Sequence, residues 1–195
     1  MPALLIATKN AHKTAEIAAI LTEWKVSDLT AHPDIPAPEE TGATFAENAA
    51  IKALAAAERF AGLVLSDDSG LEVDALGGAP GVYSARYAGP TATDADNRAR
   101  LLRELAGVRG PARAARFRCV MALAEKGTLL GTFAGAVEGI ILDEEKGAGG
   151  FGYDALFVPE GYGETFGQLP AATKNQLSHR SRALARVAAF LAARR

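Results

Sequence analysis

The stretch Leu63-Val64-Leu65-Ser66-Asp67-Asp68-Ser69-Gly70 places two adjacent carboxylates one residue after a run of three apolar residues. The apolar run predicts a strand, and because Ser, Asp and Gly favour turns, we expect the strand to end where the carboxylates begin. In open α/β sheets, ligands bind just beyond the carboxyl ends of the strands. The stretch is therefore a candidate site, although a solvated turn is the simpler interpretation of these residues alone.

The composition is that of an ordinary soluble globular domain, with 195 residues, 49% hydrophobic and 23% charged. The formal net charge of −2 provides no general attraction for nucleic acid or an anionic membrane, so a polyanionic ligand would need local cations. Neither a secretory leader nor an apolar span of about 20 residues is apparent. We expect one domain over residues 1–195, with two lobes, in the cytoplasm, with neither nucleic acid nor membrane as partner.

A strand–loop–helix unit opens the chain. The apolar run Ala3–Ala7 predicts a strand covered on both faces, and Asn10 is a credible helix N-cap. The apolar residues that recur at helical spacing after it are Ile17, Ile20, Leu21 and Trp24. Such a junction favours phosphate binding, and Lys13 opposes the helix dipole in the first turn, which a bound anion would explain.

A second helix has a clear start. Thr44 and Glu47 form a capping box, and the alanine-rich run Phe45–Ala61 has the propensity to continue the helix for several turns. Asn48 and Lys52 are four residues apart, so they share one face of this helix. That face is either simply polar or part of a site.

The middle of the chain reads as strands and one further helix. Leu71–Asp74 alternates as a half-exposed strand would, and Thr93 caps a helix. The runs Phe117–Leu123 and Leu129–Ile141 predict a long hairpin that could form a second lobe. Cys119 lies within the alternating apolar pattern, so we expect a core residue and not a nucleophile.

The last third contains a glycine-rich loop and a terminal helix. The interleaved aromatic residues of Gly147–Asp154 suggest a loop that approaches a flat ligand closely. The buried stripe predicted for the final helix consists of Leu177, Leu184, Val187 and Leu191. Lys174, His179 and Arg180 gather at its beginning, where the helix dipole opposes cations.

Two sets of charged residues stand out. The carboxylates near turns are Glu40, Asp67 and Asp68, and the cations near helix starts or faces are Lys13, Lys52, Lys174 and Arg180. Mg²⁺ prefers one or two carboxylates with phosphate oxygens and water, while cations neutralise the remaining phosphate charge. Each pair could also be a salt bridge, but the recurrence of cations at positions opposed by helix dipoles favours a metal-bound polyphosphate.

Five ordered motifs span nearly the whole chain. They are Thr8-x-Asn10-x-x-Lys13; Glu40–Ala49 followed by Lys52; Ser66–Asp74 continuing through Gly81–Tyr87; Phe151–Asp154; and Ser178–Arg180. This set resembles the inosine triphosphate pyrophosphatase family, also described as dITP/XTP pyrophosphatases. Five specific motifs in the same order make chance resemblance very improbable.

The resemblance implies an α/β fold, elongated and two-lobed around a long mixed sheet with flanking helices, with the active-site cleft between the lobes. It implies a homodimer that uses Mg²⁺ to hydrolyse the deaminated purine nucleoside triphosphates ITP, dITP and XTP to the monophosphate and pyrophosphate, clearing them from the nucleotide pool. Two alternatives stay open, namely a pyrophosphatase for modified pyrimidine nucleotides and a catalytically silent nucleotide-binding protein.

Carried over motif by motif, the resemblance makes Asp68 the general base and a metal ligand, Glu40 a second metal ligand and Asp67 a further candidate ligand. The substrate-binding residues that it implies are Thr8, Lys9, Asn10, Ala11, His12, Lys13, Lys52, Ser69, Phe151, Gly152, Tyr153, Asp154, Lys174, His179 and Arg180. Of these residues, Thr8 to Lys13, Lys52 and Lys174 would hold the triphosphate. The remainder, apart from Ser69, would surround the base.

The chain departs from the family pattern at two places. Ala155 stands where a proline usually follows the Phe151–Asp154 motif, which loosens the loop. Ala171-Ala172-Thr173 replaces acidic residues often found ahead of Lys174. Neither change removes a group assigned to the chemistry, so both bear on substrate preference more than on activity.

Overall fold

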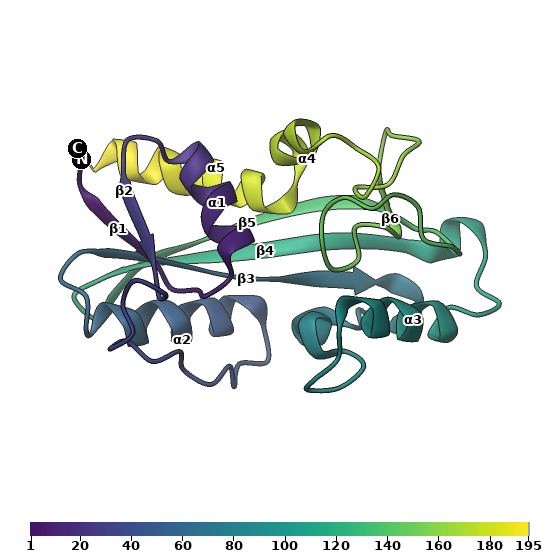
Figure 1. Cartoon of the computed structure of the whole chain (residues 1–195), viewed down its shortest axis with the longest axis horizontal. Coiled ribbons are helices and arrows are strands. Elements are labelled where there is room, and N and C mark those ends of the chain that lie inside the picture. The colour runs from purple at the N-terminus through teal and green to yellow at the C-terminus, as the bar shows by residue number, and fades with distance from the viewer. Residues whose placement is uncertain (195) are drawn as a thin grey trace. The chain divides into compact units, whose positions relative to one another are not determined.

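The structure is a computed structural model that describes residues 1–194 (Figure 1). Within these residues one sheet of six strands has the order β2-β1-β3-β4-β5-β6. The strands are β1 (Ala3–Ile6), β2 (Lys25–Asp28), β3 (Leu63–Val73), β4 (Ala114–Glu125), β5 (Thr128–Ile141) and β6 (Phe157–Pro159). The α-helices are α1 (Ala11–Ile20), α2 (Phe45–Ala57), α3 (Asp94–Glu104), α4 (Ala171–Leu177) and α5 (His179–Ala193). Because β1 is parallel to β2 and β3 whereas β5 is antiparallel to β6, the predicted α/β fold with a mixed sheet is confirmed.

The described chain divides into two compact units, each built from segments that are discontinuous in sequence. Unit 1 comprises Met1–Asp68, Cys119–Gly135 and the described residues from Arg180 onward, and unit 2 comprises Ser69–Arg118 and Ala136–His179. The strands β3, β4 and β5 each contribute residues to both units. The expectation that the β4–β5 hairpin could form the second lobe is therefore wrong, because its turn belongs to unit 1.

Unit 1 places helices on both faces of its strands, with α1 and α5 on one face and α2 on the other (Figure 1). The alternation of strand side chains produces this sandwich. The strand residues on the α1 and α5 face are Leu4, Ile6, Leu65, Cys119, Met121 and Leu123. Those on the α2 face are Leu5, Ala7, Val64, Ala122 and Ala124, which meet the buried alanines of α2. Cys119 is fully buried, as predicted, and burial raises the pKa of its thiol, which rules out a thiolate nucleophile.

Unit 2 has a separate core that is rich in aromatic side chains. The ring of Phe117 lies 4.7 Å from that of Phe157 and 6.1 Å from that of Phe166, measured between centroids. Leu101 and Leu105, at the end of α3, are fully buried in the same cluster. The predicted cap of α3 is confirmed, because Thr93 forms a capping box with its third helical residue.

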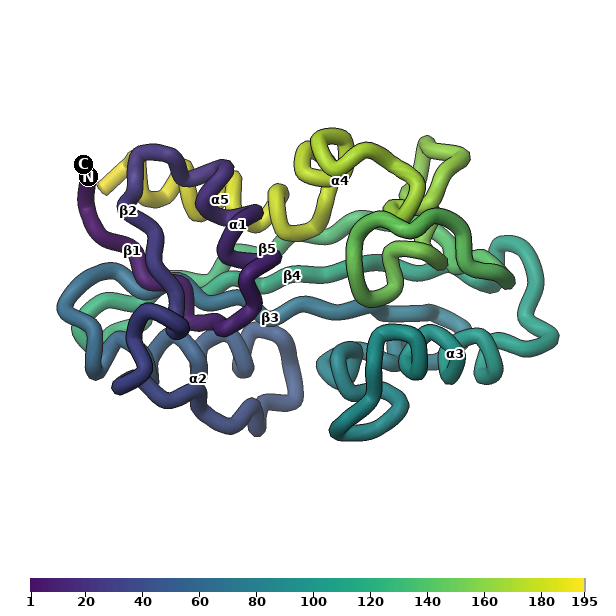
Figure 2. The backbone as a smooth tube through the Cα atoms, in the orientation of Figure 1, coloured from purple at the N-terminus to yellow at the C-terminus, as the bar shows by residue number. Residues whose placement is uncertain are grey.

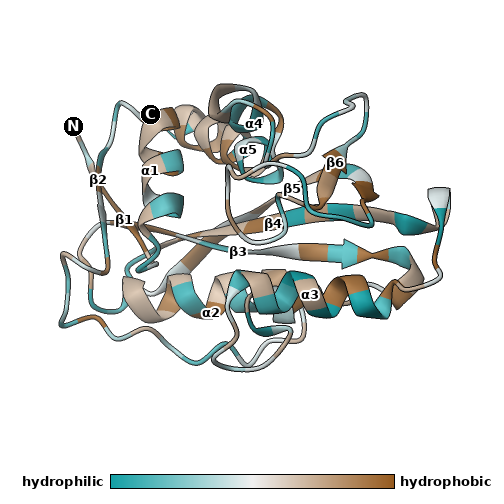
Figure 3. Cartoon of the chain, turned by 45° about the vertical axis from the view of Figure 1, so that its right-hand side comes forward, coloured by the Kyte–Doolittle hydropathy of each residue, from teal (hydrophilic) through white to brown (hydrophobic). Residues whose placement is uncertain are grey.

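The strand β3 does not end at the two aspartates. It continues from Leu63 to Val73, so the turn expected at Ser66–Gly70 is wrong. Asp67 and Asp68 are only 2% and 7% exposed, and teal polar residues interrupt the brown apolar ones along β3 (Figure 3). These residues favour turns, but they form a strand here because neighbouring cations stabilise both carboxylates inside the sheet.

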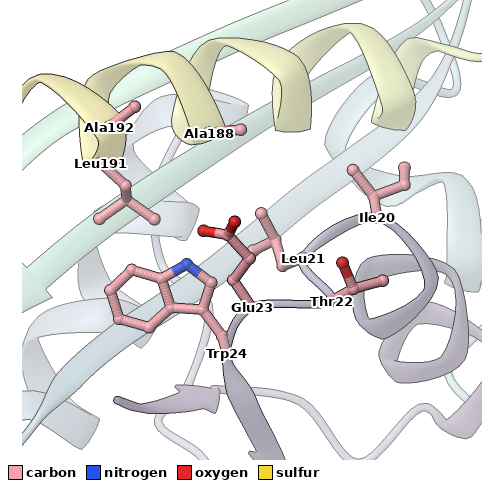
Figure 4. A pocket seen from close by; sticks show the side chains of 8 residues that line it. All are labelled: Ile20, Leu21, Thr22, Glu23, Trp24, Ala188, Leu191 and Ala192. Atoms are coloured by element: carbon pink, nitrogen blue, oxygen red, sulfur yellow. The ribbon is translucent and has the colours of Figure 1, made fainter. Parts of the chain in front are cut away.

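Two predicted helices end earlier than expected. Figure 2 follows the purple chain from β1 through α1, which stops at Ile20, so Trp24 lies outside the helix. Ile20 is 39% exposed and does not belong to the buried stripe, whereas Ile17 and Leu21 do. Trp24 nevertheless faces α5, where it lines a hollow of about 250 Å³ together with Leu191 (Figure 4).

The helix predicted to reach Ala61 ends at Ala57. The single terminal helix is also wrong, because extended backbone at Ser178 (φ −65°, ψ 157°) separates α4 from α5. Such backbone is typical of a serine before a helix. Leu177 consequently belongs to α4, while Leu184, Val187 and Leu191 form the expected buried stripe on α5.

Candidate active site

The carboxylate of Asp68 lies in the middle of β3, held by two side chains of α2. Lys52 Nζ lies 3.4 Å from Asp68 Oδ1, and Asn48 Nδ2 donates to Asp68 Oδ2 over 3.2 Å. The same ammonium lies 2.8 Å from Glu40 Oε1. The predicted shared face of Asn48 and Lys52 is confirmed, and it faces Asp68.

Asn48 joins this carboxylate to the loop that precedes α2. Its side chain is fully buried, and its Oδ1 accepts a hydrogen bond of 2.8 Å from the backbone N–H of Gly42. A Cβ at Gly42 would lie 2.7 Å from Asn48 Oδ1, so only glycine permits this approach. The loop that carries Glu40 is thereby tied to the position of Asp68.

Asp67 faces a different set of cations. Lys13 Nζ lies 2.9 Å from its Oδ2 and Arg180 Nε lies 3.8 Å from the same atom. Arg180 also pairs with Glu16 of α1. Burial raises the pKa of Asp67, but the positive charges of Lys13, Arg180 and Lys52 outweigh it and hold that pKa well below the usual range.

The two aspartates therefore differ electrostatically although they are adjacent. Burial raises the pKa of Asp68, and the neighbouring charge of Glu40 adds to the rise, while Lys52 and Asn48 lower it only in part. Burial lowers the pKa of Lys52, but the charges of both aspartates and of Glu40 raise it by more. The net pKa is raised, so this ammonium keeps its proton. Asp68 is the more basic of the two carboxylates.

The loop before α1 caps the helix with its own side chains. Asn10 Oδ1 accepts hydrogen bonds from the backbone N–H groups of His12 and Lys13, at 3.0 and 3.3 Å, which confirms the predicted N-cap. Thr8 Oγ1 accepts from the backbone N–H of Asn10. The cap thus uses two of the backbone donors that the sequence offered for phosphate. Lys9 and Asn10 are exposed, so the loop borders solvent.

Two carboxylates are available for a metal ion in unit 1. Among residues 1–194, no three His, Cys, Asp or Glu side chains converge as a ready-made metal cluster. The side chains of Glu40 and Asp68 are 29% and 10% exposed and share one ammonium, whereas Asp67 is almost fully enclosed by its cations. This donor set fits Mg²⁺, which takes one or two carboxylates and completes its coordination with phosphate oxygens and water.

A second group of predicted residues lies in unit 2. Lys174 Nζ lies 2.7 Å from Asp154 Oδ2 and 4.5 Å from the centre of the Phe151 ring. Asp154 Oδ2 also accepts a 2.8 Å hydrogen bond from the backbone N–H of Phe151, which closes a tight turn. Lys174 lies in the last turn of α4, where the dipole favours a cation, so its predicted placement at a helix start is wrong.

Three other predicted residues of unit 2 are His179, Tyr153 and Ser69. His179 stacks on Phe117 with the ring centroids 5.0 Å apart. The hydroxyl of Tyr153 donates a 2.8 Å hydrogen bond to the backbone carbonyl of Ser84, so its phenol is committed to the protein. Ser69 lies in β3 directly after Asp68 and is partly exposed.

Some positions in the loop between β5 and β6 require glycine because other protein atoms approach closely. A Cβ at Gly147 would lie 2.2 Å from the backbone of Gly167, and one at Gly150 would lie 2.1 Å from Asp154 Oδ2. Close approach of protein atoms thus accounts for both residues without a flat ligand. Gly152 differs, because it has φ +60° with open space around its Cα.

Every cation that the sequence singled out is paired inside its own unit. The partners of Lys13, Lys52, Lys174 and Arg180 include Asp67, Asp68, Asp154 and Glu16 respectively. Asp67 therefore suffices to explain Lys13 in the first turn of α1, and a bound anion is not required. These ion pairs explain the dipole-opposed cations without a bound polyphosphate.

Sequence reasoning missed several partners of the predicted residues. No sequence pattern linked Glu16 to Arg180 or Phe117 to His179, because only the fold brings each pair together. Asp94 and Arg98 of α3, which hold Gly152, were also missed. Their spacing of four residues was the available signal, since it places both on one helix face.

Comparison with known proteins identifies the chain. The model of the Ham1 family matches residues 4–190. A Desulforamulus reducens protein named dITP/XTP pyrophosphatase is 51% identical over 183 residues, which cover 93% of this chain and 91% of that protein. A Geobacter sulfurreducens protein of the same name is 50% identical over 187 residues, with 95% and 94% covered.

Solved structures of similar proteins also superpose on this chain. A HAM1 protein from Coxiella burnetii superposes with a TM-score of 0.90 at 40% identity, covering 98% of this chain and 99% of that one. A nucleoside-triphosphatase / dITP/XTP pyrophosphatase from Mycobacterium abscessus gives a TM-score of 0.77 at 39% identity, covering 95% and 98%. The predicted resemblance is confirmed over nearly the full length. The chain belongs to the Ham1 family.

Proposed function

We propose that this chain is a nucleoside triphosphate pyrophosphatase that hydrolyses deaminated purine nucleotides, namely ITP, dITP and XTP, to the monophosphate and pyrophosphate. Relatives about half identical to it over more than nine tenths of their length bear the name dITP/XTP pyrophosphatase. The structural observation that carries the proposal is Asp68, a carboxylate held between Lys52 and Asn48 beside Glu40.

The reaction is an in-line displacement at the α-phosphorus. The oxygen of a water molecule forms the new bond to phosphorus while the bond from phosphorus to the bridging oxygen of the β-phosphate breaks, and pyrophosphate leaves with that electron pair. Asp68 orients this water and accepts its proton, a role suited to a carboxylate that Lys52 and Asn48 hold in place. Lys52 keeps a positive charge beside the reacting phosphate.

Other predicted residues bind the substrate. In this proposal Thr8–Lys13 and Lys174 hold the triphosphate, and Ser69 contacts the substrate next to the base catalyst. Phe151–Asp154, with His179 and Arg180, surround the nucleobase. Arg180 is only 3% exposed and engaged with Glu16, so we assign it to positioning Asp67 and the adjacent residues more than to direct contact.

Mg²⁺ is the proposed cofactor, with Glu40 and Asp68 as its protein ligands. When bound, Mg²⁺ withdraws charge from phosphate oxygens and helps to orient the triphosphate. Asp67 is the weaker candidate ligand, because its Oδ2 already faces Lys13 and Arg180. Its buried charge instead holds those two cations near the site.

Preference for deaminated bases follows from the group at purine position six. A carbonyl there accepts a hydrogen bond, whereas the amino group of adenine donates one. A buried donor of the protein that is paired by the first and unpaired by the second discriminates by about 1–3 kcal/mol. GTP carries the same carbonyl, so its rejection depends on the amino group at position two.

Pyrophosphate release provides the direct test. The purified chain is incubated with XTP, dITP, ATP and a modified pyrimidine triphosphate, each with and without Mg²⁺. We expect release from XTP and dITP only, and only with Mg²⁺. Preferred release from the pyrimidine substrate would instead identify a pyrimidine enzyme, and no release from any substrate would identify a silent nucleotide-binding protein.

The partner of the chain is proposed to be a second copy of itself, in the cytoplasm. No helix within residues 1–194 has the length and apolar character needed to cross the bilayer. The net charge of −2 disfavours nucleic acid as a partner. Sedimentation equilibrium tests the homodimer, and a monomer at micromolar concentration would contradict it.

A further inference from the structure

We propose that Asp94 and Arg98 of α3 are positioning residues that hold the glycine-rich loop of residues 145–152 and thereby set base discrimination. The inference rests on the proposed function, because it concerns the loop assigned to the nucleobase. All residues involved belong to unit 2. In Figure 2 the loop is the green tube between β5 and β6.

Both backbone groups of Gly152 are held by α3. Its N–H donates to Asp94 Oδ2 over 2.7 Å, and its carbonyl accepts from Arg98 Nη1 over 2.8 Å. Asp94 and Arg98 are four residues apart, so one face of the helix presents both groups. The two contacts hold the two peptide groups on either side of the Gly152 Cα, so they fix the orientation of this residue as well as its position.

Arg98 also holds the other end of the loop. Its Nε forms an ion pair with Glu145 Oε1 at 3.0 Å, and its side chain is only 18% exposed. One guanidinium thus links Glu145, two residues before the first glycine of the loop, to Gly152, the last glycine of the series. The planar fork of arginine permits this double contact, which a lysine cannot reproduce.

The composition of the loop explains why such a clamp matters. Four of its residues are glycines, Gly147, Gly149, Gly150 and Gly152. Glycine loses more conformational freedom on ordering than any other residue. A loop of this kind, if released, would have to be ordered by the substrate at the expense of binding affinity.

The helix that carries the clamp is itself rigid. Thr93 Oγ1 accepts from the backbone N–H of Asp96, and the Asp96 carboxylate accepts from the backbone N–H of Thr93. Leu101 anchors the following turns in the core of unit 2. Groups that position a site are effective when they project from a regular element that cannot shift.

The clamp also restricts which atoms of the loop can read the base. The N–H and the carbonyl of Gly152 are committed to α3, the Tyr153 hydroxyl to Ser84, and one carboxylate oxygen of Asp154 to Lys174 and Phe151. The loop therefore contributes shape and the ring of Phe151 more than new hydrogen bonds. Moving Gly152 would displace the adjacent Phe151 ring.

The test compares Arg98→Ala with Arg103→Ala, which removes the same charge from an exposed position of the same helix. We expect Arg98→Ala to raise KM for XTP about 10-fold, to change kcat less than about 3-fold and to weaken the preference for XTP over GTP, because the loop is no longer preorganised. Arg103→Ala should match the wild type in all three.

A second pair of variants tests the other half of the clamp. Asp94→Asn keeps an oxygen acceptor for the Gly152 N–H, so it should stay near the wild type, whereas Asp94→Ala should behave like Arg98→Ala. Hydrogen exchange provides a readout that does not require activity. Amides of residues 147–153 should exchange faster than in the wild type in Arg98→Ala, and at the wild-type rate in Arg103→Ala.

The outcomes separate the two proposals. If the wild type releases no pyrophosphate from any substrate, the proposed function fails, and this inference fails with it. If the wild type is active but Arg98→Ala keeps its KM and its XTP preference, only the inference is overturned. A lower melting temperature of Arg98→Ala with unchanged KM and preference would likewise overturn it, since the clamp would then be purely structural.

Discussion

Lys13 Nζ lies 2.9 Å from Asp67 Oδ2, and the carboxylate side chain is only 1% exposed. The pair joins the first turn of α1 to the middle of β3. It explains at once why a cation tolerates the positive end of a helix dipole and why a carboxylate tolerates the interior of a sheet. Each charge offsets the unfavourable environment of the other.

Replacing Lys13 by methionine should destabilise the fold. Asp67 would lose its closest cation and keep the more distant charges of Arg180, at 3.8 Å, and Lys52. Removing the closest cation of a buried carboxylate costs about 3–5 kcal/mol of unfolding free energy, which urea denaturation measures. Lys9→Met is the control, because that neighbouring lysine is exposed. Equal stability of the two variants would show that the pair contributes nothing.

The adjacent aspartates should respond differently to amidation. Asp68→Asn is expected to lower turnover of XTP by about 100-fold or more while the circular dichroism spectrum stays native, because the base is lost. Asp67→Asn should mainly reduce stability, since Lys13 and Arg180 lose their shared carboxylate. Near-normal turnover in Asp68→Asn would refute its catalytic assignment.

Gly42→Ala should disturb the site through Asn48. The added methyl would lie 2.7 Å from Asn48 Oδ1 and would displace the amide that supports Asp68. Such overpacking costs about 1–3 kcal/mol, and kcat should fall with it. Gly163→Ala is a matched control, because a Cβ there meets no atom within 4 Å. Identical melting temperatures for the two variants would contradict this.

Three alanine substitutions should rank by the constraint on each glycine. Gly150→Ala combines φ +73° with a contact of 2.1 Å to Asp154 and should be the most destabilising. Gly152→Ala has φ +60° in open space, so the cost is only the left-handed conformation, about 1 kcal/mol. Gly163→Ala should be nearly neutral. Thermal unfolding of the three proteins checks the order.

The stability of the protein at alkaline pH should depend on Tyr87. Burial and the hydrogen bond that its hydroxyl donates to Glu104 raise the pKa of Tyr87 to about 12, against about 10 in an unfolded chain. A raised folded-state pKa means that this stabilisation is complete below about pH 10 and is lost as the pH rises through about 12. Tyr87→Phe lacks it at every pH.

The measurement is the difference in unfolding free energy between the wild type and Tyr87→Phe across this range. The difference should be constant below about pH 10 and shrink toward pH 12. Comparing the two proteins cancels the titration of groups that do not interact with Tyr87. Parallel curves up to pH 12 would show that the hydrogen bond does not stabilise the fold.

Local signals in the sequence predicted much of the structure. The caps at Asn10, Thr44 and Thr93 all formed, because a cap depends on residues within one helical turn. The shared face of Asn48 and Lys52 also depends only on helical spacing. Motif resemblance led to the family, and the family match confirmed it.

Predictions that depended on distant partners were less successful. The turn expected at Ser66–Gly70 is strand, because cations from α1 and α2 reach both aspartates. The close approach of other protein atoms requires glycine at Gly147 and Gly150, and the composition of the loop did not predict these contacts. Single-residue propensities do not contain such contacts.

The sequence by itself determined where α1, α2 and α3 start, which strand faces are apolar and which family the motifs resemble, since these depend on residues close together in the chain or on ordered patterns. The tertiary structure alone decided that Asp67 is a charge partner of Lys13 and Arg180, while Asp68 is a more basic carboxylate beside Lys52 and Asn48. The two aspartates are adjacent and chemically identical. Alternating directions of side chains along β3 separate them, because each meets a different set of charges.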